Sequence, residues 1–289
     1  FAPETDHDAL GLAEEDPRRR TVSVLNPVVQ GESTLKTVVV PEMARTVERN
    51  RRRGWTGPIR LFQIARTYRA VEGETLPDER EHLVVAWSGP VRPLHPDEAP
   101  RAVDPYDALG DLLGVLGGLG VEMVVTEAVA EPWMRDGSAV ALRAGEAPLG
   151  HLAEIAPTVR RRLDVDDVVL VAEFELDALV AAAERVVRVA PLSSFPPSRR
   201  DLSLVVPHHV RWADVQATVA ATTDDLLEGV ELFDVYEGDD LPDGTVAYGV
   251  RLTLRSLKDT LKDKRVDKMV KKLLDALQSE HGIRLRSES

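Results

Sequence analysis

The sequence predicts an α+β protein in which an antiparallel sheet domain precedes a smaller domain of strands and helices. Two observations predict this class. Within residues 194–286 the hydrophobic period changes between about two and about 3.6 residues, in the order strand, helix, strand, strand, helix, strand. Within residues 20–190, segments of strand character outnumber those of helix character, and no strand–helix–strand repeat is evident, which favours an antiparallel sheet.

The elements of the first domain follow from local patterns. Residues 20–26 alternate as a strand does, and Pro41 and Gly54 stand where a helix commonly starts and stops. Asp177 is a suitable N-cap for an alanine-rich helix. The remaining predicted elements are strands at 59–64, 82–89, 121–129, 138–143, 149–155 and 168–176 and helices at 105–119 and 177–187.

The second domain is predicted from its alternating and amphipathic runs. A first strand ends near residue 206, a helix covers 210–222, strands follow within 230–244 and at 246–254, a long helix covers 263–281, and residues 283–286 form the last strand. This βαββαβ order is that of the ferredoxin-like sandwich. Small sandwiches of this kind often bind nucleic acid, although a fold by itself does not establish a function.

Composition bounds the remaining possibilities. The chain has 289 residues and no cysteine, so disulfides, thiolate nucleophiles and cysteine-based zinc sites are excluded. It has no apolar run of about 18 residues, and its first residues lack the layout of a signal peptide, so we expect no membrane partner and a cytoplasmic location. The seven histidines form no recognisable metal or catalytic motif. We therefore expect no metal ligands and no catalytic residues.

Charge is unevenly distributed along the chain. The formal net charge is −13, yet residues 251–286 carry eleven lysines and arginines against five carboxylates, a net charge of +6. Phosphate contacts dominate RNA affinity, so this segment is where an RNA-binding surface is expected. A solvated helix face with ion pairs four residues apart is the alternative.

The second domain resembles a known family in specific phrases. PPSRRDLSLVV, then VELFDVYEG, then Thr260 and Leu261 ahead of the long helix are similar to the ferredoxin-fold anticodon-binding domain that closes the beta subunit of bacterial phenylalanyl-tRNA synthetase. The region from Asp8 to Arg69 is similar to the class II synthetase-like core of the same subunit. The residues in register with that core are Asn26, Pro27, Glu32, Ser33, Leu35, Thr37, Pro41, Asn50, Arg53, Leu61 and Phe62.

The resemblance implies a domain plan and a role. Residues 1–19 would be a lead-in from upstream domains, 20–190 a class II synthetase-like core, 191–198 a proline-rich linker and 199–289 the anticodon-binding domain. The core would be catalytically inactive, because Arg66 and Arg69 lie in a strand like the second class II motif but no G-x-G-x-G-x-x-R phrase follows.

The resemblance also implies partners and cofactors. The alpha subunit would hold ATP, phenylalanine and magnesium, so no bound cofactor is expected in this segment. For the whole enzyme, ATP and magnesium are implied through the alpha subunit and the upstream domains of the beta subunit. The partners would be the alpha subunit, in an alpha2-beta2 heterotetramer, and tRNA(Phe), with no DNA. The alternative is a non-enzymatic RNA-binding or oligomerisation module related to that subunit.

Two sets of site residues follow from the resemblance and the charge pattern. The expected RNA-binding residues are Arg199, Arg200, Arg255, Lys258, Lys262 and Lys264. On the helix that starts at Pro41, Met43 and Val47 would form an apolar anchor at the subunit interface, flanked by Arg49 and Arg53; an ordinary helix with a core stripe is the alternative. For Phe233 and Tyr236 we expect burial against the helices, with stacking on an RNA base as the alternative.

Overall fold

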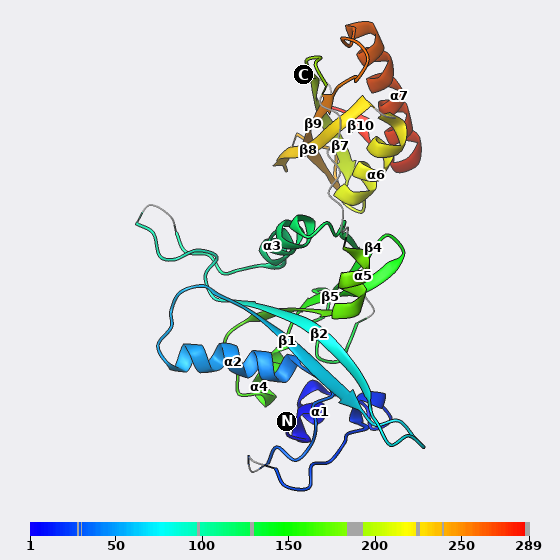
Figure 1. Cartoon of the computed structure of the whole chain (residues 1–289). Helices are drawn as coiled ribbons and strands as arrows, with labels where there is room; N and C mark the ends of the chain where they lie inside the picture. Colours follow the sequence, from blue (N-terminus) through cyan, green and yellow to red (C-terminus); the bar gives the residue numbers. More distant parts are fainter. Residues whose placement is uncertain are drawn as a thin grey trace. The chain divides into compact units, whose positions relative to one another are not determined.

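The chain forms two compact units, residues 1–187 and residues 188–289. The structure is a computed structural model, and Figure 1 shows its elements in chain order. The residues that it describes are 1–27, 29, 31–96, 99–127, 130–183, 193–223, 226–238 and 240–286. Two residues of the predicted linker, 191 and 192, and the end of the predicted helix 177–187 lie outside the described residues.

Unit 1 is built on one antiparallel sheet of six strands, in the order β1-β2-β6-β5-β4-β3. The strands are β1 (Ile59–Arg69), β2 (Asp78–Ser88), β3 (Val124–Glu127), β4 (Val140–Ala144), β5 (Ala147–Glu154) and β6 (Val169–Glu175). Each strand alternates between the two faces, and apolar side chains line both. The antiparallel sheet predicted for this part of the chain is therefore confirmed.

Helices cover both faces of this sheet (Figure 1). On one face lie α1 (Thr5–Leu10), α2 (Val40–Arg52) and α4 (Pro157–Arg162); on the other lie α3 (Pro105–Gly118) and α5 (Leu176–Ala182). A single 3₁₀ turn, η1 (Pro17–Arg19), follows α1. Pro41 and Gly54 bracket α2 as predicted, and Gly54 has the positive φ of 89° that a residue after a helix end commonly adopts.

Three features of unit 1 differ from the sequence prediction. Residues 20–26 form no strand, because Ser23 makes only an isolated bridge to Thr34 and the segment joins neither edge of the sheet. The helix α4 was not predicted. Residues 1–19, expected to be a lead-in, contain α1 and bury Leu10 and Leu12 in the core of unit 1.

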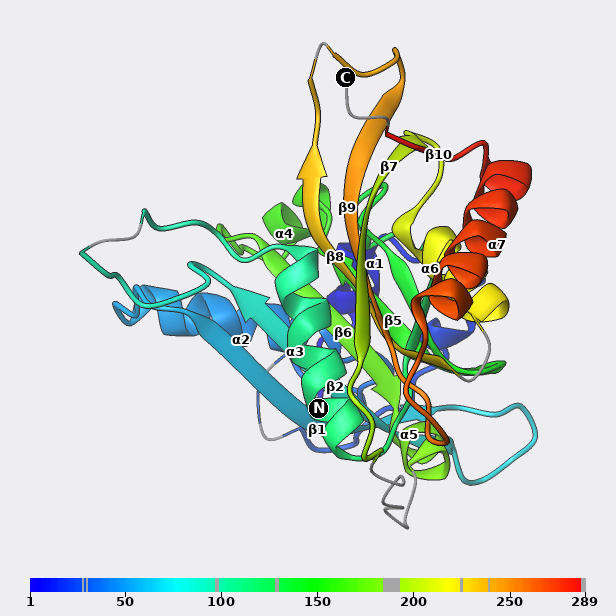
Figure 2. The same ribbon diagram turned by 90° about the horizontal axis from the view of Figure 1, so that it is seen from above.

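Unit 2 has an antiparallel sheet of four strands, in the order β10-β7-β9-β8. Its elements are β7 (Ser198–Pro207), α6 (Trp212–Thr223), β8 (Leu227–Tyr236), β9 (Thr245–Leu254), α7 (Asp263–His281) and β10 (Arg284–Leu285). The predicted βαββαβ order is confirmed. Both helices lie on the same face of the sheet (Figure 2).

The core of unit 2 lies between this sheet and its two helices. Leu204 and Leu252 point from the strands toward α7, which contributes Val266, Leu273 and Leu277, and all five are at most 2% exposed. Full burial of such side chains contributes roughly 1.5–3 kcal/mol each. Among the described residues, no helix of unit 2 covers the opposite face of the sheet, which we call the open face. No described helix of either unit is long and apolar enough to cross a membrane.

Candidate nucleic-acid interface

The six basic residues predicted to bind RNA lie at one end of unit 2. The start of β7 pairs with the end of β9, with Ser198 opposite Leu254. The connection from β9 to α7 leaves from the same end. The six residues are Arg199 and Arg200 in β7, Arg255, Lys258 and Lys262 in that connection, and Lys264 in the first turn of α7.

The two adjacent arginines of β7 point to opposite faces of the sheet. Arg199 is exposed on the open face, whereas Arg200 lies on the helix side. There the Arg200 guanidinium donates to Asp263 at 2.9 Å and to Asp267 at 3.4 Å, both in α7. These carboxylates raise the pKa of Arg200 and balance its charge. Arg199 and Arg200 therefore do not form the single basic surface that their adjacency in the sequence indicated.

The other predicted residues differ in whether a carboxylate pairs with their charged group. Arg255 donates to Glu228 at 2.9 Å and to the carbonyl oxygen of Phe195 at 3.4 Å. Lys258, Lys262 and Lys264 are exposed, and in the described part of the chain no carboxylate pairs with their ammonium groups. The three lysines and Arg199 are thus the members of the predicted set that are available to phosphate.

The open face carries two aromatic rings that sequence reasoning placed against the helices. Phe233 is 47% exposed and Tyr236 is 41% exposed, so the expected burial of both side chains is wrong. The guanidinium of Arg251 lies 5.0 Å from the Phe233 ring centroid, and that of Arg286 lies 5.0 Å from the Tyr236 ring centroid. Aromatic rings and guanidinium planes on an open sheet are the groups on which unpaired RNA bases stack.

A shift in strand register reverses the faces of the residues after Phe233, so that Tyr236, opposite Ala247, lies on the open face. The pairing of β8 with β9 passes from Leu232 opposite Val250 to Asp234 opposite Gly249, which leaves Phe233 as the extra residue of a bulge. Its ring lies over Gly249, where an added Cβ atom would be 2.9 Å from a ring carbon. Glycine therefore allows the ring to lie close to the backbone of β9.

Ion pairs hold the cations of the open face in position. Arg251 donates two hydrogen bonds of 2.8 Å to the two carboxylate oxygens of Asp201, which raises the pKa of Arg251 and lowers that of Asp201. The hydroxyl of Tyr236 donates to Asp240 at 2.7 Å, and the nearby carboxylate raises the Tyr236 pKa. These contacts restrict both aromatic side chains, which remain 47% and 41% exposed. Arg251 and Arg286 were not predicted as site residues, although Arg251 alternates with apolar residues in VRLTL, as an open-face residue would.

The residues predicted at a subunit interface also separate into two groups. Met43 and Val47 are 2% and 0% exposed and pack in the core of unit 1 between α2 and the sheet. They are therefore not available as an exposed anchor, because the same stripe that could meet a partner is used to attach α2. Arg49 and Arg53 are exposed along the outer side of α2, beside a shallow depression of about 540 Å³.

The strand β1 presents exposed apolar residues at the edge of the unit 1 sheet. Phe62 is 73% exposed and Ile64 is 56% exposed. On the same face of β1, Arg66 pairs with Glu79 at 3.1 Å and with Glu81 at 2.9 Å. Arg66, one of the two arginines noted in the second-motif-like strand, is therefore neutralised by two carboxylates. Among the described residues, no group of three or more His, Asp or Glu is arranged to hold a metal ion.

A half-buried polar cluster lies in unit 1. Nδ1 of His82 is 3.1 Å from one oxygen of Glu173, and Nε2 of His151 is 3.8 Å from the other. The His151 ring also contacts Trp133, with ring centroids 5.4 Å apart. Burial lowers the pKa of His151, although the Glu173 carboxylate opposes this effect. The three side chains are partly exposed, at 15% for His82, 19% for Glu173 and 27% for His151.

Comparison with known proteins agrees with both units. Residues 1–176 match the family described as "Phenylalanyl tRNA synthetase beta chain CLM domain", and residues 193–286 match the family described as "Ferredoxin-fold anticodon binding domain". The sequence is also similar to curated proteins named "Phenylalanine--tRNA ligase beta subunit". One from Symbiobacterium thermophilum is 33% identical over 281 residues, which cover 97% of this chain and 31% of the relative.

Two further relatives carry the same name. The protein of Geobacter sulfurreducens is 29% identical over 96% of this chain and 35% of its own length, and that of Xanthomonas oryzae is 31% identical over 92% of this chain and 33% of its own length. The chain thus spans about a third of the length of these relatives. On the match of residues 1–176, which is more than half of the chain, this protein belongs to the phenylalanyl-tRNA synthetase beta-chain family.

Proposed function

We propose that this chain acts as the C-terminal part of the beta subunit of a phenylalanine–tRNA ligase. In this role it binds tRNA(Phe) on the anticodon side and supports the alpha subunit, in an alpha2-beta2 assembly in the cytoplasm. The observation that carries the proposal is the open face of unit 2, where Phe233 and Tyr236 lie exposed beside two guanidinium groups. The match to an anticodon-binding domain family supports the same role.

The chemistry of the open face suits an unpaired anticodon loop. Bases that are not stacked within a helix can lie on Phe233 and Tyr236, while the guanidinium planes of Arg251 and Arg286, which are held by Asp201 and Asp240, add cation–π contacts. Arg199 and the three exposed lysines at the end of the sheet can follow the adjoining backbone phosphates. Stacking thus selects unpaired bases, and the cations orient the strand.

Catalysis is assigned to the alpha subunit. Formation of an aminoacyl adenylate requires cations that stabilise the phosphates in the transition state. Here the guanidinium of Arg66 is engaged by Glu79 and Glu81, which supports a core without adenylating activity. The ATP and magnesium needed for charging would be held by the alpha subunit and by other parts of the beta subunit.

The contact with the alpha subunit is proposed on exposed residues of unit 1. Arg49 and Arg53 provide positive charge on α2, and Phe62 and Ile64 provide apolar surface at the edge of β1. Exposed apolar side chains gathered at one place commonly mark a protein interface. These two take the anchoring role that Met43 and Val47 cannot fill. A free RNA-binding module is the alternative, and it would need no such contact.

The adjacent arginines of β7 provide a matched test of RNA binding. We expect Arg199→Ala to weaken tRNA(Phe) binding and to reduce the slope of log K against log salt by about 0.7–0.9, the contribution of one phosphate contact. Arg200→Ala removes the same charge on the helix side and should leave the slope unchanged. Equal effects of the two substitutions, or no effect of either, would contradict the proposed surface.

Co-purification with the cognate alpha subunit tests the assembly. Phe62→Ser should reduce the amount of alpha subunit recovered with the chain. Leu94→Ser, which changes a highly exposed apolar residue elsewhere in unit 1, should not. If wild-type chain binds tRNA(Phe) but never retains the alpha subunit, the alternative of a free RNA-binding module is favoured.

A further inference from the structure

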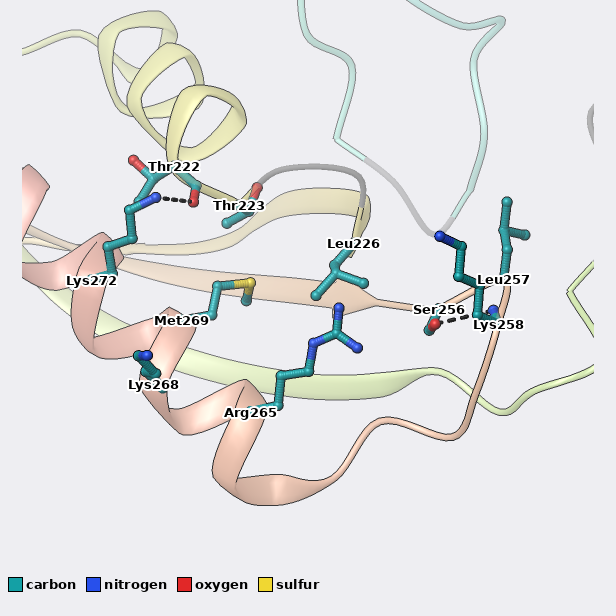
Figure 3. Close-up of a pocket in the computed structure, with 10 residues that line it drawn as sticks. All are labelled: Thr222, Thr223, Leu226, Ser256, Leu257, Lys258, Arg265, Lys268, Met269 and Lys272. Carbon is teal, nitrogen blue, oxygen red and sulfur yellow. Dashed lines mark hydrogen bonds between the residues drawn. The ribbon is translucent and has the colours of Figure 1, made fainter.

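Two surface features of this chain are open to a ligand or a partner, a cavity in unit 2 and the outer edge of β1 in unit 1. The cavity has a volume of about 470 Å³ and lies between α7 and the segment after β9. Its cations do not converge, since Figure 3 shows Lys258 and Lys268 at opposite ends. On the edge of β1, by contrast, the backbone groups form one regular row.

The strand β1 lies at the edge of the six-stranded sheet. All eleven of its residues pair with β2, in a regular register that runs from Ile59 opposite Ser88 to Arg69 opposite Asp78. An edge strand presents unpaired N–H and C=O groups along its other side, and these are a template for a further strand. Strands commonly have about 5–6 residues, so β1 offers an unusually long edge.

Hydrogen bonds at the far end of β1 show which residues face outward. The N–H of Tyr68 donates to the carbonyl oxygen of Lys36 at 2.8 Å, and that of Ala70 donates to the carbonyl oxygen of Arg20 at 2.9 Å. Neither acceptor belongs to β2, so the backbone groups of alternate residues point away from β2. By this alternation the other outward-facing residues are Arg60, Phe62, Ile64 and Arg66. Among the described residues, none donates to or accepts from the backbone groups of these four on the outer side.

The side chains along this free edge are apolar at the centre and balanced in charge at both ends. Phe62 and Ile64 are 73% and 56% exposed. At one end Arg60 pairs with Asp111 at 2.8 Å, and at the other Arg66 pairs with two glutamates of β2. A segment that covers the edge therefore meets apolar surface at two alternate positions and needs no charged side chain of its own.

The same edge already accepts extended chain from within unit 1. Lys36 bonds to Tyr68, and the chain then enters α2 at Val40. The free part of the edge continues the row of donors and acceptors that this contact uses. A second copy of the chain, paired antiparallel through the same four residues, would place Arg60 opposite Arg66 at each end, and like charges directly opposite are unfavourable. A strand from a different chain avoids this.

We propose that the alpha subunit adds an extended strand to the outer edge of β1. The added segment is uncharged, pairs its backbone with the four outward-facing residues, and places apolar side chains against Phe62 and Ile64. This assignment rests on the proposed function, which places the alpha subunit at the same two side chains. It adds the manner of the contact, which is main-chain pairing.

Hydrogen exchange at single-residue resolution on the whole chain tests the proposal. In the chain alone, the outward-facing amides of β1 should exchange rapidly, and the amides between them, which bond to β2, should exchange slowly. Binding of the alpha subunit should slow exchange at Phe62, Ile64 and Arg66 at least about tenfold, because each amide gains an acceptor. The amide of Tyr68 is bonded in both states and should stay protected. A contact through side chains alone would not protect alternate amides.

A substitution that removes one outward N–H gives a second test. Ile64→Pro is compatible with an edge strand, because the lost N–H does not bond to β2. Ile64→Ala is the control, since it shortens the side chain and retains the N–H. Affinity for the alpha subunit should be at least about threefold weaker for Ile64→Pro than for Ile64→Ala, and equal affinities would overturn the proposal. If thermal melts show that Ile64→Pro is unfolded, the exchange pattern of the wild type decides alone.

The outcomes separate this proposal from the proposed function. If the alpha subunit is retained while Phe62, Ile64 and Arg66 still exchange rapidly, strand addition is wrong and the proposed assembly stands. If the alpha subunit is not retained, strand addition and the proposed assembly both fail, and binding of tRNA(Phe) by unit 2 is judged by its own test. Protection of the three amides in the chain alone, increasing with its concentration, would assign the edge to a second copy and overturn the proposal.

Discussion

Replacement of Phe233 by alanine separates RNA affinity from folding, because the ring is fixed on the open face yet contributes little to the core. Stacking of one base on an aromatic side chain is worth roughly 1–3 kcal/mol, so Phe233→Ala should weaken tRNA(Phe) binding by roughly fivefold to 150-fold. The ring is 47% exposed. About half of the roughly 1.5–3 kcal/mol that full burial of such a side chain contributes is then lost from stability.

The assay is fluorescence anisotropy of labelled tRNA(Phe), with thermal unfolding measured on the same samples. Val235 provides the control, since it is 54% exposed in the same strand but pairs with Tyr248, whose side chain packs toward the helices. Val235→Ala should cost a similar amount of stability and leave the affinity unchanged. The reasoning is refuted if Phe233→Ala binds tRNA(Phe) as tightly as the wild type, or if both substitutions weaken binding equally.

Four further outcomes are expected. Burial lowers the pKa of His151 in the folded chain. As pH falls below about 6.5, the unfolded chain therefore gains a proton that the folded chain does not, and the free energy of unfolding should decrease. Denaturant titrations from pH 7.5 to 5 should show a shallower decrease of this free energy with pH for His151→Gln than for the wild type, and an identical pH dependence would contradict this. An alanine at Gly150 would place its Cβ atom on the carbonyl oxygen of Glu173 in the neighbouring strand, so Gly150→Ala should destabilise unit 1 by about 3 kcal/mol. Gly114 in α3 has open space around it, so Gly114→Ala should stabilise the chain by about 0.5–1 kcal/mol, and thermal melts that rank the two variants otherwise would count against the geometry. Purified chain should catalyse no phenylalanine-dependent exchange of pyrophosphate into ATP, and clear exchange without an alpha subunit would show that the core is active.

The hydrophobic period predicted those helices and strands that keep one period over most of their length. The strand pattern around Leu204 and Leu252 and the stripe of Val266, Leu273 and Leu277 each bury one face, so unit 2 could be predicted in order from the sequence. The exposed position of Tyr236 could not, because the one-residue bulge at Phe233 reverses the face of the residues that follow it and leaves no mark on the hydrophobic period.

The site residues depended on contacts between distant parts of the chain. Arg200 is neutralised by Asp263 and Asp267, more than sixty residues away, so its basic character in the sequence did not indicate available charge. Met43 and Val47 form a stripe that is the same whether a helix meets its own sheet or a partner. Only the three-dimensional structure, in which the sheet of unit 1 covers this stripe, shows that the helix packs on its own sheet and not on a partner.

Competition between RNA fragments tests the central claim, which is that this chain binds tRNA(Phe) on its anticodon side. Labelled tRNA(Phe) bound to the whole chain is titrated with an isolated anticodon stem–loop and, separately, with a minihelix of the acceptor stem of equal charge. The account predicts that the stem–loop displaces the tRNA and that the minihelix does not, because unpaired bases stack on Phe233 and Tyr236. Equal displacement by both fragments, or displacement by the minihelix alone, would contradict it.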